Sequence, residues 1–391
     1  MAAPGAYPYQ WLWDAGFIAL GWATIDGARA WRELETLFRG QAPDGFLPHV
    51  LAHHPPDGRF PEPDLWGRPG DPATSGITQP PVLASVALRL LEQAPTAGSE
   101  AAASRLWPRL VAFHRWFHQA RDPAGRGVVV SLHPWETGMD DSPAWDGPLH
   151  RVVPGSGLRA PAGDRPASDA YPRFLALVAE LREAGYDSAL LLEKGSFLVA
   201  DVCTNAVLAR ADADLVRLGR RLGAGQEDVS SAAEWAARSA AGLVSLWDED
   251  AGLFLSRDLL TGGLLPCGTA ASFLGLWSGA ATAAQAQRLV HHLRRWGQDL
   301  RLVPSSDPGA PGFDPRRFWR GPVWVNVNWM VAEGLREHGE DGLAERIALE
   351  TRRLLEGAGM REHFDPRTGA GLGATDFSWT AALARWWLEM E

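Results

Sequence analysis

The residues best suited to chemistry lie in the stretch 135–146, Trp-Glu-Thr-Gly-Met-Asp-Asp-Ser-Pro-Ala-Trp-Asp, which holds four carboxylates and two tryptophans. Gly138 can adopt backbone conformations that other residues avoid, and Pro143 fixes φ and lacks an N–H, so the stretch is expected to be a shaped loop. Such loops concentrate catalytic groups. Tryptophan beside aspartate also suits a sugar site, because the indole covers the apolar face of a pyranose while the carboxylate binds hydroxyls or moves protons. The alternative is a solvated acidic turn.

Two further stretches combine tryptophan with polar side chains. The stretch 10–14 (Gln-Trp-Leu-Trp-Asp) opens the first expected helix, so Asp14 is expected to cap that helix, to bind substrate, or to do both. The stretch 318–326 (Phe-Trp-Arg-Gly-Pro-Val-Trp-Val-Asn) is the second dense aromatic segment. Trp319 and Trp324 bracket its Gly-Pro break, which suits the rim of a pocket better than a core stripe.

A metal site is not expected. The stretch 362–366 (Glu-His-Phe-Asp-Pro) carries two carboxylates, but His363 has no second histidine at ligand spacing. Cys203 and Cys267 lie in apolar surroundings without a CxxC pattern, so both are expected to be buried thiols that form neither a disulfide framework nor a zinc site.

The elements that must position these residues are helices. Apolar residues recur at helical spacing over 14–38, 80–95, 104–120, 170–184, 196–223, 228–247, 267–278, 283–297, 320–338, 341–357 and 376–390. Without strand-length alternation, the pattern predicts an all-α protein. Helices joined alternately by short turns and long loops favour an (α/α)6 barrel, a single domain over 1–391, with the long loops around one mouth. A helical solenoid is the alternative, but no constant period of about 30–50 residues is present.

Two long loop insertions are expected near 53–79 and 146–168, both rich in Gly and Pro. Long irregular loops in compact domains are usually functional, so the first is predicted to be a lid that closes over the substrate with Trp66 inside it. Disorder is the alternative. Gln79 ends this segment just before a helix, where it could reach the barrel mouth.

The composition limits the classes of partner that the protein is expected to bind. The net charge of −10 disfavours nucleic acid and anionic membranes, which require a basic face. There is no apolar run of about 18 residues and no signal-peptide pattern at the N-terminus, so a soluble cytoplasmic protein is expected. The sequence does not fix the oligomeric state.

Four separate segments, with a fifth that closes the last, carry a resemblance that spans nearly the whole chain. The sequence resembles family 63 glycoside hydrolases, which are (α/α)6-barrel glycosidases, and more distantly trehalases. The compact length resembles the bacterial mannosylglycerate and glucosylglycerate hydrolases of that family. The matching segments are QWLWDAGF (10–17), ETGMDDSPAW (136–145), FWRGPVWVNVNW (318–329), EHFDPRTGAGLG (362–373) and DFSWTAA (376–382).

The resemblance implies that Asp140 is the general acid and Glu362 the general base. It also implies two groups of substrate-binding residues. The sugar-site residues are Trp11, Trp13, Asp14 and Gln79. The aromatic residues next to the scissile bond are Phe318, Trp319 and Trp324. The sequence departs from the family pattern at Thr137, Asp141, Ala144 and Phe318, where Ser, Asn, Arg and Tyr are common. If Asp141 lies close to Asp140 and is buried, its negative charge would raise the pKa of the acid.

The implied reaction is inverting hydrolysis of a small α-glycoside such as glucosylglycerate or mannosylglycerate. In that mechanism Asp140 protonates the glycosidic oxygen and Glu362 activates a water, which requires carboxyls about 6.5–9.5 Å apart. No cofactor is needed. A glycerate carboxylate would need a cation in this acidic pocket, and Arg173 is the favoured candidate over Arg320.

Three alternatives remain. The first is an α-glucosidase that acts on a neutral disaccharide or oligosaccharide, like trehalases or glucosidase I. The second is a sugar epimerase, which would need paired histidines at the barrel base. The third is a non-catalytic sugar-binding barrel, against which the presence of both Asp140 and Glu362 argues.

Overall fold

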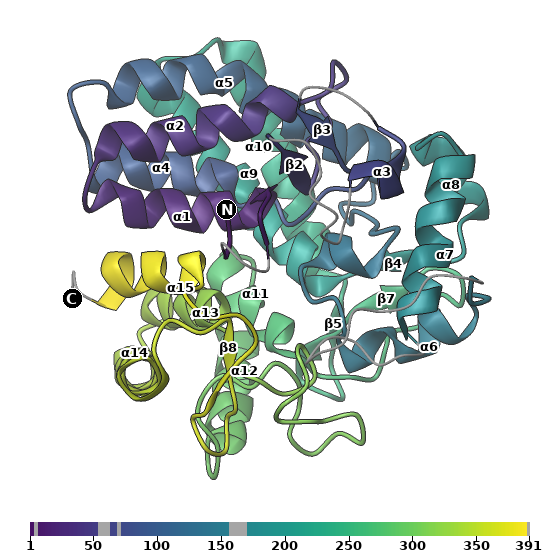
Figure 1. The fold of residues 1–391 in the computed structure, drawn as a ribbon, viewed down its shortest axis with the longest axis vertical. Coiled ribbons are helices and arrows are strands. Elements are labelled where there is room, and N and C mark those ends of the chain that lie inside the picture. The colour runs from purple at the N-terminus through teal and green to yellow at the C-terminus, as the bar shows by residue number, and fades with distance from the viewer. Residues whose placement is uncertain (4–6, 54–62, 69–71, 156–169, 389–391) are drawn as a thin grey trace.

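The computed structural model describes residues 1–3, 7–53, 63–68, 72–155 and 170–388 (Figure 1). Its architecture is mostly helical, as predicted. The α-helices are α1 (Leu12–Ala23), α2 (Gly27–Leu37), α3 (Pro63–Trp66), α4 (Leu83–Gln93), α5 (Ser99–Trp116), α6 (Asp146–His150), α7 (Ala170–Glu183), α8 (Ser188–Lys194), α9 (Val202–Leu222), α10 (Gln226–Val244), α11 (Leu274–Ser278), α12 (Ala283–Trp296), α13 (Val325–Glu337), α14 (Asp341–Ala358) and α15 (Ser378–Leu383).

The strands are only two or three residues long and pair antiparallel, in the orders β1-β2-β3, β4-β7, β5-β6 and β8-β9. They are β1 (Gln10–Trp11), β2 (Val50–Ala52), β3 (Ala73–Thr74), β4 (Val199–Ala200), β5 (Trp247–Asp248), β6 (Leu253–Phe254), β7 (Arg257–Asp258), β8 (His363–Phe364) and β9 (Gly371–Leu372). Two of these pairings hold residues next to the candidate site, because β1 leads into α1 and β8 follows Glu362.

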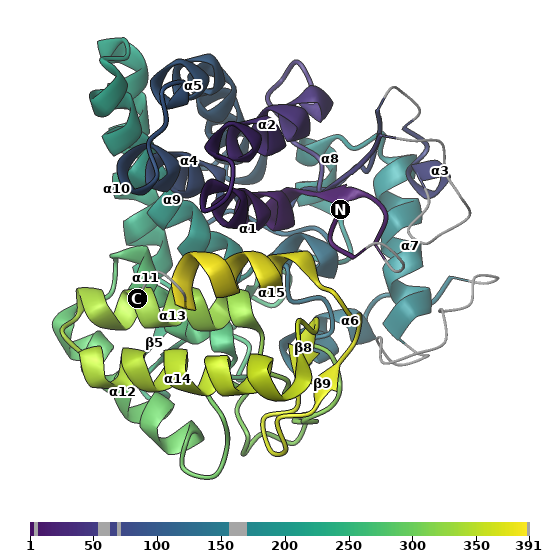
Figure 2. The ribbon, with the colours of Figure 1, turned by 60° about the vertical axis from the view of Figure 1, so that its left-hand side comes forward.

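Consecutive long helices form packed pairs, visible as neighbouring layers in Figures 1 and 2. One set of helices is linked by successive contacts: α1 with α4, α4 with α9, α9 with α11, α11 with α13, α13 with α15, and α15 with α1. Each of the first five also contacts the helix that follows it in the chain, namely α2, α5, α10, α12 and α14. The apolar faces of these helices form the main hydrophobic core.

Several predicted helix boundaries are wrong. The helix expected over 14–38 is two helices, because Asp26 breaks the run and caps α2 by accepting a hydrogen bond from Arg29 N. Asp14 does not cap α1; the helix begins at Leu12, and Asp14 is buried in its first turn. The helix expected from 196 begins at Val202, where Asp201 caps it. Residues 267–278 contain only a 3-10 turn and the short α11. The helices α3, α6 and α8 were not predicted.

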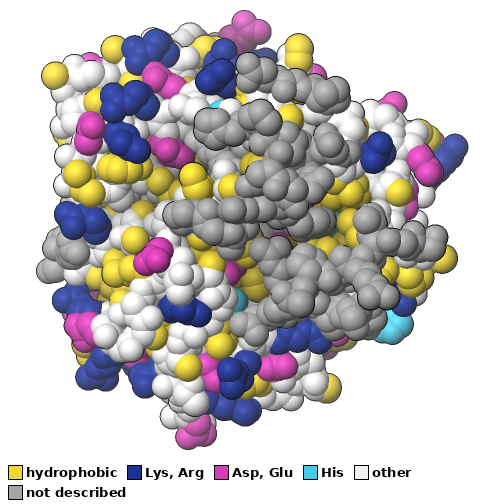
Figure 3. Space-filling model, viewed as in Figure 1, with side chains coloured by type: hydrophobic (Ala, Val, Ile, Leu, Met, Phe, Trp, Pro, Cys, Tyr) yellow, Lys and Arg dark blue, Asp and Glu magenta, His cyan; other side chains and the backbone are white. Residues whose placement is uncertain are grey.

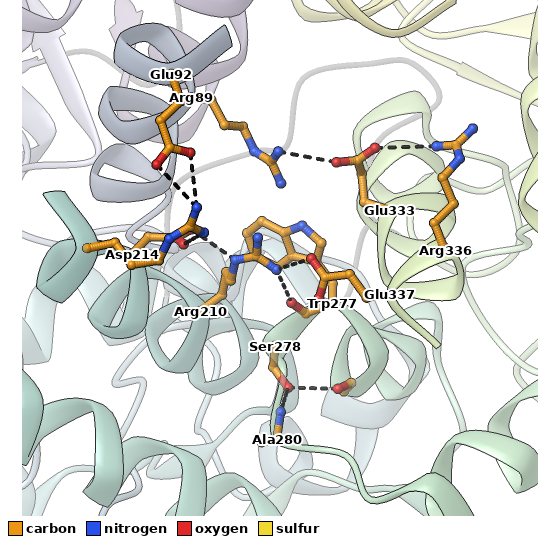
Figure 4. A network of polar contacts seen from close by, with 12 residues as sticks. Arg89, Glu92, Arg210, Asp214, Trp277, Ser278, Ala280, Glu333, Arg336 and Glu337 are labelled. Atoms are coloured by element: carbon orange, nitrogen blue, oxygen red, sulfur yellow. Dashed lines mark hydrogen bonds and ion pairs between the residues drawn. The ribbon is translucent and has the colours of Figure 1, made fainter. Parts of the chain in front are cut away.

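Charged side chains from the C-terminal halves of α4 and α13 gather beside the middle of α9 (Figure 4). Arg89 of α4 pairs with Glu333 of α13 at 3.2 Å. Arg210 of α9 donates to Glu337 at 2.7 Å and to the carbonyl of Trp277 at 3.0 Å. These contacts tie helices that are far apart in the sequence, and those of α13 lie away from its N-terminal end, where Trp324 lines the candidate site.

The surface mixes charges of both signs. On the face shown in Figure 3, arginine and carboxylate side chains alternate, so its described residues present no continuous basic surface of the kind that nucleic acids bind. Among the described residues, no helix is long and apolar enough to cross a membrane.

Candidate active site

A cavity, with about 710 Å³ of space including its opening to solvent, lies at the N-terminal ends of α1 and α13 and beside the loops that precede α4 and α15. We call it the tryptophan cavity. Predicted site residues from five distant segments line it: Trp11, Trp13, Asp14, Gln79, Asp140, Phe318, Trp319, Trp324 and Glu362. The short strands and 3-10 turns at these helix ends are what bring the segments together.

The acid loop, residues 132–141, holds Asp140 at the cavity. His133 begins a 3-10 turn over Pro134–Thr137 by accepting a hydrogen bond from Trp135 N at 3.0 Å, and its Nε2 lies 3.0 Å from the carbonyl of Phe174. Burial lowers the pKa of His133 to about 3, so the ring is neutral and can accept at Nδ1. Gly138 then turns the chain with φ of 71°. A Cβ at Gly138 would lie 2.6 Å from the indole of Trp13, so glycine is required here for both conformation and space.

Glu136 holds this loop in place through hydrogen bonds of its carboxylate. Its carboxylate accepts two hydrogen bonds from Arg121, at 2.7 and 2.9 Å, in a bidentate pair. It also accepts from Leu132 N at 2.7 Å and from Thr78 N at 3.3 Å. Arg121 and Glu136 are both buried, with side-chain exposures of 4% and 2%. One carboxylate therefore connects the acid loop to the segment that presents Gln79.

Asp141, the neighbour of Asp140, forms ion pairs with two arginines. Arg317 donates to it at 2.8 and 3.1 Å, and Arg320 lies 3.3 Å from the same carboxylate. Burial raises the pKa of Asp141, and both guanidinium groups counteract that effect. The charge that the sequence analysis expected to act on Asp140 is thus largely balanced by its ion pairs. Arg320 also forms a bidentate pair with Asp146.

Glu362 is presented by the β8–β9 hairpin. Its Oε1 accepts a hydrogen bond from the Tyr7 hydroxyl at 2.7 Å, and its Oε2 accepts from Ala374 N at 2.8 Å. Both donors stabilise the carboxylate form that a general base requires. Gly373 lies so close that a Cβ there would be 2.4 Å from Glu362 Oε2. Asp365, three residues on, accepts hydrogen bonds from Arg367 N and Thr368 N instead, which folds the hairpin turn.

Stacked rings form one wall of the cavity. Trp319 and Trp324 are parallel with centroids 4.0 Å apart, and His363 stacks on the far side of Trp324 at 4.7 Å. Burial, followed by the charge of Arg361, lowers the pKa of His363 to about 3, so the ring is neutral. Trp13 lies 6.3 Å from Trp319 and extends the aromatic surface toward the acid loop.

Asp14 lines this cavity with a strongly perturbed carboxyl. Burial raises its pKa to about 7, and the charge of Glu362 acts in the same direction. Because this value lies above the usual 3.8, the folded protein keeps a proton that the unfolded chain releases. The contribution of Asp14 to stability is therefore fully present below about pH 4 and is lost as pH rises to about 7.

Asp14→Asn should remove the part of the pH dependence of stability that Asp14 causes, because asparagine does not ionise. The Tm of the variant relative to the wild type is expected to increase by a few degrees between about pH 4 and pH 8. Thermal melts at both pH values measure the difference, with Asp44→Asn, an exposed aspartate, as the control. Equal Tm differences at the two pH values would contradict the raised pKa.

Two predicted site residues lie outside the lining. Trp66 is buried behind the cavity wall, with its ring 5.3 Å from His49 and 5.9 Å from Trp135. Arg173 donates through Nη1 to the carbonyls of Leu149 and Val152. Much of the predicted lid, residues 54–62 and 69–71, and most of the second insertion, 156–169, lie outside the described residues, so lid closure stays a prediction.

The sequence analysis missed several lining residues: Tyr7, His49, Trp135, Tyr171, Phe377 and Trp379. Most are aromatic and sit within a few residues of a motif, which was the available signal. Tyr7 precedes Trp11 by four positions, and Trp379 belongs to the DFSWTAA segment.

The arrangement suits acid–base chemistry on a sugar. Asp140 and Glu362 line one aromatic cavity, and carboxyl groups can donate and accept protons there. Within the described part of the chain, no cluster of three His, Cys, Asp or Glu side chains is arranged to hold a metal ion.

Comparisons with known proteins identify the family of this chain. The chain is 47% identical to a mannosylglycerate hydrolase of Thermus thermophilus, with 98% of this chain and 95% of that protein covered. It is 36% identical to a glucosylglycerate hydrolase of Mycolicibacterium hassiacum, covering 99% and 93%. The crystal structure of a family 63 mannosylglycerate hydrolase from Thermus thermophilus with Tris and D-glycerate superposes with a TM-score of 0.94 at 47% identity, covering 99% and 95%. Residues 7–380 match the model of the mannosylglycerate hydrolase MGH1-like glycoside hydrolase domain. The chain therefore belongs to this family of glycoside hydrolases, and the resemblance to family 63 is confirmed.

Proposed function

We propose that the protein hydrolyses a glycosylglycerate, with mannosylglycerate as the preferred substrate and glucosylglycerate as the second, and with inversion at the anomeric carbon. The observation that carries the proposal is the meeting of Asp140 and Glu362 at one cavity walled by tryptophans. Asp140 acts as the general acid toward the glycosidic oxygen. Glu362 acts as the general base toward a water on the opposite face of the ring.

The contacts of Glu362 and Asp14 support these roles. Tyr7 and Ala374 donate to Glu362, which leaves the carboxylate oriented to accept a proton from water. Asp14 and Gln79 line the same space and offer polar atoms to sugar hydroxyls, while Trp319 and Trp13 cover an apolar ring face. Successive contacts from α1 through α15 and back to α1 also support a closed (α/α)6 barrel, in which this cavity is the mouth.

The experiment is a hydrolysis screen over mannosylglycerate, glucosylglycerate, trehalose and kojibiose, with released sugar as the readout. Proton NMR of the first turnovers should show the β-anomer of the free sugar before mutarotation, because inversion of an α-glycoside gives that anomer. Higher kcat/KM on trehalose or kojibiose would favour the neutral α-glucosidase alternative, and early α-anomer would exclude inversion.

The glycerate carboxylate needs a cation near two catalytic carboxylates. Arg173 is the proposed partner, since among the described contacts only its Nη1 is used, on main-chain carbonyls, and it pairs with no carboxylate there. Arg173→Ala should raise KM for mannosylglycerate about tenfold or more, but hardly for the neutral mannosylglycerol, because a charge-assisted bond is lost only with the acid.

Arg182→Ala is the matched control, since Arg182 also lies on α7 and donates to a main-chain carbonyl, that of Leu65, at 3.1 Å. Equal losses on charged and neutral substrates in Arg173→Ala would mean that Arg173 only holds α7 to α6.

A further inference from the structure

A second cavity, with about 370 Å³ of space including its opening to solvent, is lined in part by Arg121, which binds Glu136 of the acid loop. We call it the Arg68–Arg121 cavity. Its wall is aromatic and aliphatic, with two arginines and one exposed aspartate; the residues that matter to the argument are Phe46, Arg68, Trp116, Arg121, Tyr186 and Ser188. None of these residues lines the tryptophan cavity.

Arg68 retains its donors for a ligand, whereas the free Nε of Arg121 is buried out of reach of one. The guanidinium of Arg68 lies over the rings of Phe46 and Tyr186, at 5.0 and 5.3 Å, and meets no carboxylate among the described residues. Arg121 is only 3% exposed; its Nη atoms bind Glu136, while its Nε is buried and has no acceptor among the described residues. Asp44 also lines the cavity, but it is exposed and its Oδ1 accepts from Phe46 N at 3.0 Å.

These contacts define the chemistry of an occupant. The Arg68 guanidinium, which has no counter-ion among the described residues, favours an anionic oxygen, because charge-assisted hydrogen bonds are the stronger ones. Flat guanidinium groups favour a carboxylate, and aromatic walls favour a flat apolar body. Asp44 disfavours a dianion. The cavity therefore matches a small aromatic or similarly flat monocarboxylate better than it matches phosphate.

Two chains of contacts link this cavity to the active site. Arg121 holds Glu136, whose carboxylate also binds Leu132 N in the acid loop. Tyr186 donates its hydroxyl to the carbonyl of Trp66, and the ring of Trp66 packs on Trp135 at the wall of the tryptophan cavity. An occupant that contacts Arg121 and Tyr186 would thus touch the supports of the acid loop on both sides.

We propose that the Arg68–Arg121 cavity is a second binding site, specific for a small flat monocarboxylate, and that its occupation alters the placement of the acid loop. Binding at this site does not depend on the proposed glycosidase substrate. Its effect on turnover does, and the two are measured separately.

Binding is tested by calorimetric titration with benzoate, and with benzamide as the neutral isostere. Benzoate should bind one site, benzamide should bind about tenfold more weakly or not at all, and Arg68→Gln should weaken benzoate about tenfold, as expected for one lost charge-assisted bond. Asp44→Asn should not weaken benzoate. Absent benzoate binding, equal binding of benzamide, or unchanged binding to Arg68→Gln would overturn the proposal.

Location and coupling are tested with Ser188→Phe, which places a ring in the Arg68–Arg121 cavity from the start of α8. The variant should lose benzoate binding, and its own rate of mannosylglycerate hydrolysis without benzoate serves as its reference. In the wild type, benzoate should change kcat without raising KM, and the change should vanish in Ser188→Phe. A pure rise in KM, or benzoate binding retained by Ser188→Phe but lost in Trp13→Ala, would place the anion in the tryptophan cavity and refute the second site. If mannosylglycerate is not hydrolysed at all, the proposed function fails while the titrations still decide the site.

Discussion

Asp140→Asn is expected to lower kcat for mannosylglycerate by about 10³-fold, because asparagine cannot give a proton to the departing glycerate oxygen. Glu362→Gln should cause a loss of similar size, because the water is no longer deprotonated. Both side chains line the cavity at its surface, so circular dichroism and Tm should change little. Steady-state kinetics of purified variants measure the losses.

The leaving group separates the two roles. A 2,4-dinitrophenyl mannoside departs without a proton, so Asp140→Asn should recover much of its activity on it, whereas Glu362→Gln should stay equally impaired. Asp141→Asn is the matched control. It breaks the pairs with Arg317 and Arg320, so it should lower Tm by several degrees while kcat changes little. If Asp141→Asn lost as much turnover as Asp140→Asn at unchanged Tm, the acid would be Asp141.

The sequence was most informative about short motifs and least informative about the partners of each side chain. Asp140, Glu362 and the tryptophans of stretches 10–14 and 318–326 meet at one cavity as expected, because motif residues sit at helix ends and loops whose positions the fold determines. Asp141 was expected to raise the pKa of Asp140 if the two carboxyls lay close together and Asp141 was buried. Its arginine partners are far away in the chain, and no local pattern predicts such pairing.

Trp66 shows a second limit of sequence reasoning. Its size and apolar character predicted burial, and it is 1% exposed. Hydrophobicity, however, does not tell which side of a wall a ring will face, and Trp66 packs behind His49 and Trp135. The break between α1 and α2 was missed for a related reason: helical spacing continues through residues 24–26, while the Asp26 cap that ends it is a contact of a single side chain.

Glu136 is one of the four carboxylates in the stretch 135–146. The structure shows that it pairs with the buried Arg121 and does not line the tryptophan cavity. Glu136→Gln should lower the free energy of unfolding by about 3–5 kcal/mol, because it leaves the buried Arg121 charge without its counter-ion. It should also lower kcat by about 10–100-fold, because the acid loop loses the acceptor for Leu132 N and Thr78 N and Asp140 is displaced. Urea unfolding and steady-state kinetics measure the two effects, with Glu100→Gln, from an exposed pair with Arg221, as the control.

The double variant Glu136→Gln/Arg121→Gln distinguishes positioning from stability. With no charge left buried, it should regain much of the lost unfolding free energy, since replacing both partners of a buried pair costs far less than removing one. Its kcat should nevertheless stay low, because the carboxylate that held the acid loop is still missing. Its defect should also shrink on the dinitrophenyl mannoside, as for Asp140→Asn, because only proton donation depends on the displaced loop. A double variant that recovered kcat together with stability would show that Glu136 acts on the fold alone and has no part in placing the acid.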